Sequence, residues 1–205
     1  MDEQGLIQAA QEGDVNAFNR LVAEYQTQVY NLAYRIMGEA ASADDAAQEA
    51  FIAAYKNLRR YRGGSFRAWL LRIVTNACYD ELRRRKRRPA ASLEALAVVD
   101  KGPDADAEGS LASAEESPED YVQRRELARS IQDCLDHLPE DMRSVVVMSD
   151  VMDMEYAEIA LSLEAALGTV KSRLSRARAR LRDCLRGTVW ELLPAAFRLE
   201  DETPA

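Results

Sequence analysis

Apolar residues recur every three or four positions in several stretches of the chain, which is the spacing of amphipathic helices. The stretch 21–36 ends near Gly38, an expected helix C-cap, and the stretch 46–58 follows Ser42, an expected N-cap. A third stretch, 66–77, follows Ser65, which can also cap a helix. The expected core positions are Leu21, Val22, Tyr25, Val29, Leu32, Ala33 and Ile36; Ala46, Ala47, Ala50, Phe51, Ala54, Tyr55 and Leu58; and Phe66, Trp69, Leu70, Ile73, Val74 and Ala77.

The second half of the chain continues in helical spacing. One apolar stripe stops at Leu138–Pro139, and Pro139 suits the first turn of a helix over 142–152. A short helix over 154–161, a turn and a basic helix over 168–181 follow, with Thr169 as the expected cap of the last helix. This order is typical of a helix-turn-helix, whose second helix can enter a major groove. The alternative is a cationic surface helix on an ordinary bundle.

The stretch between the two helical parts has a different composition. Residues 89–123 are rich in Ala, Ser, Gly, Pro and acidic residues, with too little apolar surface to offset the entropy of ordering. The pattern therefore predicts an all-α protein of two small helical domains, 1–88 and 124–187, joined by an acidic flexible linker (89–123) and followed by a tail (188–205).

Composition excludes several classes of function. The three cysteines are widely spaced and form no CxxC, so we expect neither a disulfide nor a zinc site, and a single histidine leaves little material for catalytic or metal chemistry. No apolar run reaches the roughly 18 residues that span a bilayer, and the acidic start of the sequence lacks the apolar stretch typical of a signal peptide, so we expect none. We expect a cytoplasmic protein without membrane insertion, cofactor, metal or catalytic residues.

The net charge of −8 hides a strong segregation. Residues 59–88 hold eleven bases and two acids, and residues 171–186 hold seven bases and one acid. Local potential rather than summed charge decides what such patches attract, and a phosphate backbone is the natural partner of both.

The first basic patch combines a loop and a helix face. The loop Arg59-Arg60-Tyr61-Arg62-Gly63-Gly64-Ser65-Phe66 is basic and aromatic, as suits single-stranded bases, and a polar face continues along the next helix. That face carries Arg72, Asn76, Asp80 and Arg83 and runs into six consecutive cations, 83–88. The alternatives are that Phe66 and Trp69 are core residues and that the cations form a solubilising tail.

Together these segments resemble a bacterial extracytoplasmic-function (ECF) sigma factor, a two-domain member of the RNA polymerase sigma-70 family. The resemblance spans roughly residues 6–187. It rests on four motifs in order, which are Asp44–Phe51, Phe66–Leu70 with Asn76, Leu138–Pro139 with Arg143, and Gly168–Leu174.

The resemblance implies three binding surfaces and no catalysis. The implied surface for core RNA polymerase, on its beta-prime clamp, is Asp44, Asp45, Gln48, Glu49 and Phe51, although a solvated acidic helix start is the simpler interpretation. The implied −10 DNA residues are Arg62, Gly63, Gly64, Ser65, Phe66, Asn76, Asp80, Arg83 and Arg84. The implied −35 DNA residues are Thr169, Lys171, Ser172, Arg173, Ser175, Arg176 and Arg178.

Further partners follow from the same resemblance. They are promoter DNA, the polymerase beta flap and an anti-sigma factor, while the linker would thread through polymerase near the RNA path. The apolar tail residues Trp190, Leu192, Leu193 and Phe197 could contact an anti-sigma factor or fold back on the second domain.

One segment departs from the family pattern. Glu164 stands where a Gly is usual in the helix-turn-helix turn, and Ala166 stands where Pro is common. A Glu in a left-handed turn costs on the order of 1 kcal/mol, so either the turn takes another shape or the pattern shifts by a residue.

Two other classes of function compete with a sigma factor. A stand-alone helix-turn-helix regulator would leave the Asp44–Phe51 face and the Arg62–Phe66 loop unexplained. A helical protein-interaction module would show no salt-dependent binding of DNA.

Overall fold

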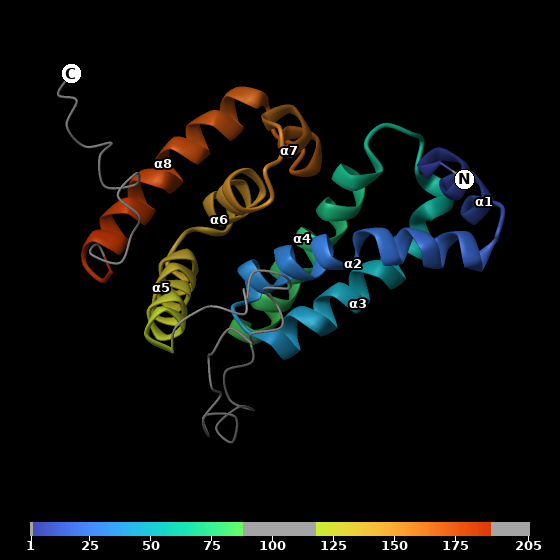
Figure 1. Ribbon diagram of the computed structural model, residues 1–205. Coiled ribbons are helices and arrows are strands. Elements are labelled where there is room, and N and C mark those ends of the chain that lie inside the picture. Colours follow the sequence, from blue (N-terminus) through green and yellow to red (C-terminus); the bar gives the residue numbers. More distant parts are fainter. Residues whose placement is uncertain (1, 88–117, 190–205) are drawn as a thin grey trace.

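The computed structural model describes residues 2–87 and 118–189, and every regular element in these two ranges is a helix (Figure 1). The all-α expectation is confirmed. Residues 88–117, which hold most of the expected linker and Arg88, and the tail positions Trp190, Leu192, Leu193 and Phe197 lie outside the described residues. The elements are α1 (Glu3–Gln11), α2 (Val15–Met37), α3 (Ala40–Asn57), η1 (Leu58–Arg60), α4 (Phe66–Arg87), α5 (Pro118–Asp136), α6 (Glu140–Val146), η3 (Val147–Val151), α7 (Tyr156–Ser162) and α8 (Leu167–Arg186).

The N-terminal unit is built on mutual packing of α2, α3 and α4, with α1 against α2. Helix α2 begins where the Asp14 carboxylate accepts hydrogen bonds from the backbone N–H groups of Asn16 and Ala17, 2.8 and 3.2 Å away. It ends at Gly38, whose φ of 73° is left-handed, as expected of a glycine C-cap. The apolar stripe between these caps is buried, with Val29, Leu32 and Ile36 fully inaccessible to solvent.

Helix α3 begins earlier than the sequence suggested. Its N-cap is Glu39, so Ser42 is not the cap but a buried residue of the first turn. The Ser42 hydroxyl donates to the Glu39 carboxylate and accepts a hydrogen bond from Arg85 of α4 at 2.5 Å. Ser42 therefore stabilises the packing of α3 on α4. Tyr55, expected in the core, is 42% exposed.

The C-terminal unit packs α5, α6 and α7 around α8. The expected helix over 142–152 is present, but it starts at Glu140 and changes at Val147 into a π-helical turn. Helix α8 starts at Leu167 with Ala166 as its N-cap, so the expectation that Thr169 caps it is wrong. Thr169 lies within the first turn.

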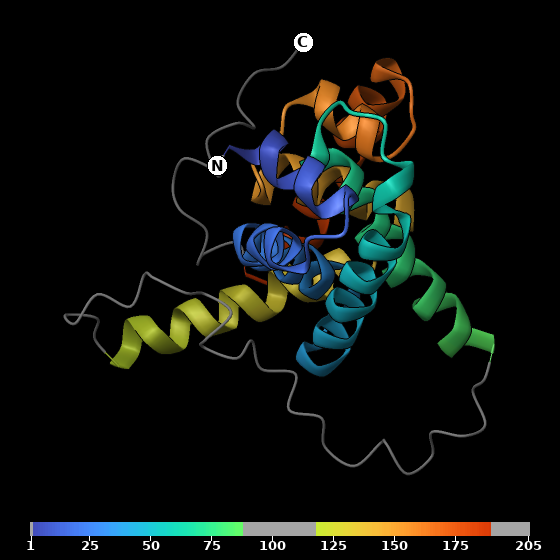
Figure 2. The ribbon, with the colours of Figure 1, turned by 90° about the vertical axis from the view of Figure 1, so that its right-hand side faces the viewer.

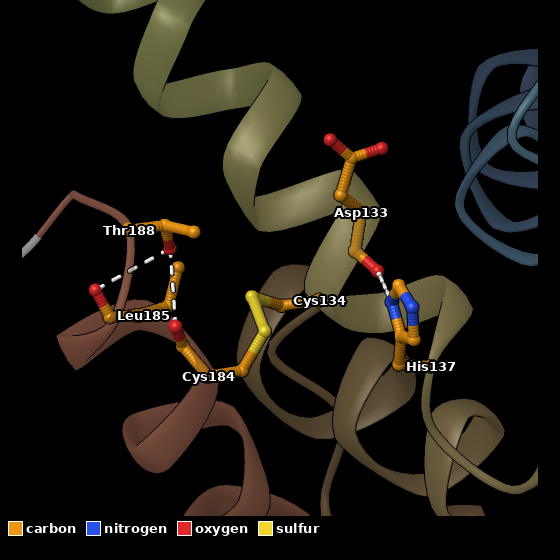
Figure 3. The surroundings of a disulfide bond; sticks show 6 residues. All are labelled: Asp133, Cys134, His137, Cys184, Leu185 and Thr188. Carbon is orange, nitrogen blue, oxygen red and sulfur yellow. Dashed lines mark hydrogen bonds between the residues drawn. A yellow bond between two sulfur atoms is a disulfide. The ribbon is translucent and has the colours of Figure 1, made fainter.

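A disulfide joins α5 to α8, the first and last helices of this unit. Cys134 of α5 and Cys184 of α8 are bonded through their sulfur atoms (Figure 3), so the expectation that the chain has no disulfide is wrong. The two residues are 50 positions apart in the chain, but the packing of α5 on α8 brings their Cα atoms within 5.9 Å. Both lie on the apolar stripes of their helices, and that shared feature is the signal the sequence offered.

The two units contact each other directly. Helix α4 packs against α7, and α2 packs against α5 and η3. The last turns of α4, which carry the cluster of arginines, extend beyond the neighbouring helices (Figure 2). This contact places the loop before α4 and the polar face of α4 beside the C-terminal unit.

Candidate nucleic-acid interface

The loop between η1 and α4 is held open by its glycines and braced by aromatic rings. Gly63 and Gly64 have φ of 98° and 97°, a left-handed conformation that residues with a side chain rarely adopt. The Tyr61 ring lies 5.6 Å from Phe66 and 5.2 Å from Trp69, and its hydroxyl donates to the Gly64 carbonyl at 2.7 Å. The loop is therefore exposed, and it rests on an aromatic base formed by the packed rings of Tyr61, Phe66 and Trp69.

Burial divides the expected −10 residues of this loop. Arg62, Gly63 and Gly64 are exposed, whereas Phe66 is 2% exposed and belongs to the core. The Phe66 ring therefore supports Tyr61 and does not face a base in this arrangement. Ser65 caps α4, because its hydroxyl accepts a hydrogen bond from the Ala68 N–H at 3.1 Å.

The polar face of α4 is present as expected. Asn76 and Asp80 are exposed, and Arg83 lies one turn further along. Between this face and the C-terminal unit is a cavity of about 220 Å³. It is lined by Arg72, Thr75, Asn76, Tyr79, Arg83, Glu140, Asp141, Ser144, Ser162, Leu163, Glu164 and Arg173.

The positive charge of the arginine cluster at the end of α4 is partly neutralised by glutamates of the same unit. Glu81 accepts hydrogen bonds from Arg84 at 2.6 Å and Arg85 at 2.9 Å, and Arg85 also pairs with Glu39 of α3 at 3.2 Å. These arginines hold the pKa of the Glu81 carboxyl below its usual range, chiefly through the hydrogen bond from Arg84. Glu81 lies three and four positions before Arg84 and Arg85, which is the spacing at which side chains on one helix can form ion pairs.

The helix-turn-helix consists of α7, a tight turn and α8. Glu164 adopts φ 47°, so the turn is left-handed despite the missing glycine. Two backbone hydrogen bonds close it, from Ala165 to the Ala160 carbonyl at 3.0 Å and from Glu164 to the Leu161 carbonyl at 3.5 Å, which is the Schellman pattern. The turn therefore has its left-handed residue at Glu164 itself, and no shift of the pattern by a residue is needed.

The expected −35 residues of α8 differ in their contacts. Lys171, Ser172, Ser175 and Arg176 are exposed on one side of its N-terminal half. By contrast, Arg173 is partly buried and pairs with Asp141 at 3.0 Å. Arg178 forms two hydrogen bonds to the Asp150 carboxylate, at 2.9 and 2.6 Å, which raise the pKa of its guanidinium. Arg178 is also exposed, but its guanidinium is engaged by Asp150.

The outer face of α3 combines acidic and apolar groups. Its expected polymerase-contact residues Asp44, Asp45, Gln48 and Glu49 are exposed, while Phe51 packs partly against the core. Ile52, which the sequence pattern did not single out, is 49% exposed beside them. Its helical spacing from Gln48 and Glu49 is the signal that could have found it.

Two searches concern other kinds of site. Among residues 2–87 and 118–189, no group of three or more His, Cys, Asp or Glu side chains could hold a metal ion. Across the same part of the chain, no helix has the length and apolarity needed to cross a membrane.

Known families and proteins match both helical parts of the chain. Residues 21–88 match the family model of sigma-70 region 2, and residues 128–181 match that of sigma-70 region 4. The ECF RNA polymerase sigma factor SigE of Mycolicibacterium smegmatis is 37% identical over 82% of this chain, which spans 62% of that protein's length. The RNA polymerase sigma-H factor of Pseudomonas aeruginosa is 36% identical over 86% of this chain and 90% of its own.

A solved structure extends the likeness to three dimensions. CnrH, solved in complex with the cytosolic domain of CnrY, is 26% identical and superimposes with a TM-score of 0.66 over 91% of this chain and 99% of its own. CnrH therefore shares its fold with most of this chain. The chain belongs to the ECF sigma factors of the sigma-70 family.

Proposed function

We propose that this chain binds core RNA polymerase and directs it to promoters, where the N-terminal unit captures the melted −10 element and the C-terminal unit reads the −35 element. The observation that carries the proposal is the glycine loop on its aromatic base, continuous with the polar face of α4. Exposed polar groups around a fixed loop suit the edges of unstacked bases. A stand-alone helix-turn-helix regulator has no use for this surface.

Each surface has a distinct task in the proposal. Arg62, Ser65, Asn76 and Asp80 contact the unpaired strand, while Arg83 and Arg84 lie near duplex phosphates. Lys171, Ser172, Ser175 and Arg176 of α8 enter the major groove, where Ser and Arg side chains read base edges and Lys contacts phosphate. Thr169, Arg173 and Arg178 support or extend this contact.

The outer face of α3 is the proposed polymerase-docking surface. Asp44, Asp45, Gln48 and Glu49 supply charge complementarity, and exposed Ile52 supplies apolar area, the combination found at protein interfaces. The beta-prime clamp is the proposed partner here, and the beta flap is the partner of the C-terminal unit. The chain performs no chemistry itself, because polymerase supplies the catalysis.

Regulation and location follow from this role. An anti-sigma factor is a proposed partner, since the similar chain CnrH was solved with a second protein bound. The proposed location is the cytoplasm, where polymerase and promoters are.

Reconstituted transcription tests the proposal. Purified chain is added to sigma-free bacterial core polymerase on a pool of genomic promoter fragments, and discrete transcripts are expected only when the chain is present. Asn76→Ala and Arg176→Ala should reduce these transcripts, whereas Arg20→Ala, an exposed change on α2, should not. Duplex binding without any association with core polymerase would overturn the proposal in favour of the stand-alone regulator.

A further inference from the structure

The last residue of α1 binds the backbone just before the glycine loop, which consists of Arg62, Gly63 and Gly64. The Gln11 side-chain amide donates two hydrogen bonds, to the Leu58 carbonyl and to the Tyr61 carbonyl, both at 3.0 Å. These carbonyls belong to the first residue of η1 and to its C-cap. A side-chain amide carries two N–H groups, so both donors of this residue are used. The backbone is therefore fixed at both ends of η1.

Tyr61 extends this anchor to the far end of the glycine loop. Its ring packs on Phe66 and Trp69, and its hydroxyl donates to the Gly64 carbonyl at 2.7 Å. The tyrosine thus holds the loop at its start, through the carbonyl that Gln11 binds, and also at its end. The anchor matters because glycine has the widest backbone freedom of any residue, and both glycines of the loop adopt left-handed φ.

Helix α1 is itself held by the rest of the N-terminal unit. Leu6, Ile7 and Ala10 are buried in the core of that unit. At the other end of α1, the Glu3 carboxylate accepts a hydrogen bond from the Tyr25 hydroxyl of α2 at 2.6 Å. The glycine loop, by contrast, is exposed along its whole length. A well-packed helix can therefore serve as the anchor of a segment that has no buried side chain of its own.

We propose that Gln11 is a positioning residue for the glycine loop, which it holds, through Tyr61, in the shape that receives an unpaired base. The inference deepens the proposed function and rests on it, because it takes this loop as part of the −10 surface. Ordering a backbone segment costs conformational entropy, and glycine loses more than any other residue. A loop that is already ordered in the free chain does not add this cost when a base is captured.

The alternative role for Gln11 is overall stability of the N-terminal unit. The contacts predict a local effect instead, because the buried residues of α1 and the Leu58 side chain, which is 1% exposed, do not depend on the amide. Without the amide, the Leu58 carbonyl keeps a hydrogen bond from the Tyr61 N–H at 3.0 Å, whereas the Tyr61 carbonyl loses the bond from Gln11. The change should therefore be concentrated at Tyr61 and the loop that follows it.

Two variants of the full chain and one matched control test the inference. Gln11→Met keeps a similar length and helix propensity but removes both donors. Gln11→Glu keeps the shape and places an acceptor where the donors were. Gln8→Met makes the same change as the first variant one turn earlier on α1, at an exposed residue whose side chain donates to Glu12 at 3.3 Å.

The first readout is the accessibility of Trp69 to acrylamide, measured by fluorescence quenching. For this measurement every protein carries Trp190→Phe, which leaves Trp69 as the single tryptophan of the chain. The Trp69 ring is partly buried and lies 5.2 Å from the Tyr61 ring. Both Gln11 variants should have a larger quenching constant than the parent and Gln8→Met, with unchanged far-ultraviolet circular dichroism. An unchanged quenching constant, or loss of helical circular dichroism in both Gln11 variants, would overturn the inference.

The second readout is transcription with core polymerase, at saturating concentrations of the chain, from two forms of one promoter found by reconstituted transcription. One form is fully duplex, and in the other the −10 element is left unpaired by changes in the template strand. Both Gln11 variants should lower transcripts about tenfold from the duplex form and less than about threefold from the unpaired form, where base capture no longer drives strand separation. Gln8→Met should match the wild type on both. Equal losses on the two forms would indicate fewer folded molecules and would overturn the inference.

Failure of the proposed function has a different signature. If the wild type yields no transcript from either form of the promoter, the loop is wrongly assigned and the inference falls with it. If the wild type transcribes and the Gln11 variants match it on the duplex form, only the inference fails.

Discussion

Cys134 and Cys184 tie α5 to the last turn of the helix that carries the proposed −35 residues. The bond closes a loop of 50 residues that contains α6, α7 and nearly all of α8. Such a cross-link restricts the unfolded chain and so favours the folded form. The proposed DNA-reading helix is thus covalently anchored at its far end.

Reduction of this disulfide should destabilise the C-terminal unit. The double variant Cys134→Ser and Cys184→Ser should lower the free energy of unfolding by about 2–4 kcal/mol, as measured by urea denaturation. Dithiothreitol should lower the free energy of unfolding of the wild type by a similar amount and leave that of the double variant unchanged. An identical unfolding midpoint with and without dithiothreitol would contradict the disulfide.

Counting free thiols provides an independent test of the disulfide. Cys78 is buried in α4, and burial raises the pKa of its thiol to about 12. The thiolate is the reactive form, so the oxidised native chain should show no thiol titratable by Ellman's reagent at pH 8 and one after denaturation. Three thiols after denaturation without reductant would show that the disulfide had not formed.

Alkaline pH should weaken the contact between the two units. Burial raises the pKa of Tyr79 from 10.0 to about 12, so the folded state favours the protonated phenol. The stability this adds is complete below pH 10 and is lost as the pH rises toward 12. Between pH 10 and 12 the free energy of unfolding should fall by about 2 kcal/mol less in Tyr79→Phe than in the wild type, as measured by urea denaturation. Parallel curves for the two proteins over that range would contradict a buried phenol.

The glycine loop should be sensitive to a methyl group although space is available. A Cβ on Gly64 would meet nothing within 4 Å, but its φ of 97° disfavours any side chain. Gly64→Ala should therefore destabilise the loop by about 1 kcal/mol and reduce transcription, with little change in the far-ultraviolet circular dichroism.

Gly168 provides the matched control, because it is helical and a Cβ there also meets nothing within 4 Å. Gly168→Ala should raise stability by about 0.5–1 kcal/mol. A loss of stability as large as that of Gly64→Ala would contradict the conformational explanation.

The arginines of α8 should differ in their importance for duplex DNA. Arg176 and Arg178 are both exposed, but Asp150 holds the Arg178 guanidinium, so Arg176→Ala should cost about 1–3 kcal/mol of binding free energy and Arg178→Ala less than about 1 kcal/mol. Fluorescence anisotropy on a duplex taken from the transcribed fragments measures both. An equal loss for the two variants would show that Arg178 leaves Asp150 to bind DNA.

Local patterns predicted the helices better than their ends. The stripe of α2 and its glycine cap at Gly38 were readable, because spacing and cap chemistry act within one segment. The predicted caps Ser42 and Thr169 are wrong, because α3 and α8 begin earlier, with Glu39 and Ala166 as N-caps whose side chains form no capping hydrogen bond. The local sequence therefore offers no capping signal at these two starts.

Contacts between distant segments were beyond the sequence pattern. The Cys134–Cys184 bond and the pairing of Arg67 with Glu158 each need two segments to be brought together by the fold. Exposure also separated residues of the proposed site that the motifs had grouped, leaving Phe66 in the core and Arg62 at the surface. Motifs therefore located the proposed surfaces, and only packing divided their residues into exposed and supporting ones.

Permanganate footprinting of promoter DNA tests the central claim most directly, because permanganate oxidises unstacked thymines. With core polymerase and the chain together, thymines near the −10 element should become reactive, and Asn76→Ala should reduce this reactivity while Arg20→Ala should not. Neither core polymerase nor the chain alone should produce it. Protection of duplex DNA by the chain alone, with no thymine reactivity in the presence of polymerase, would contradict a role in promoter melting.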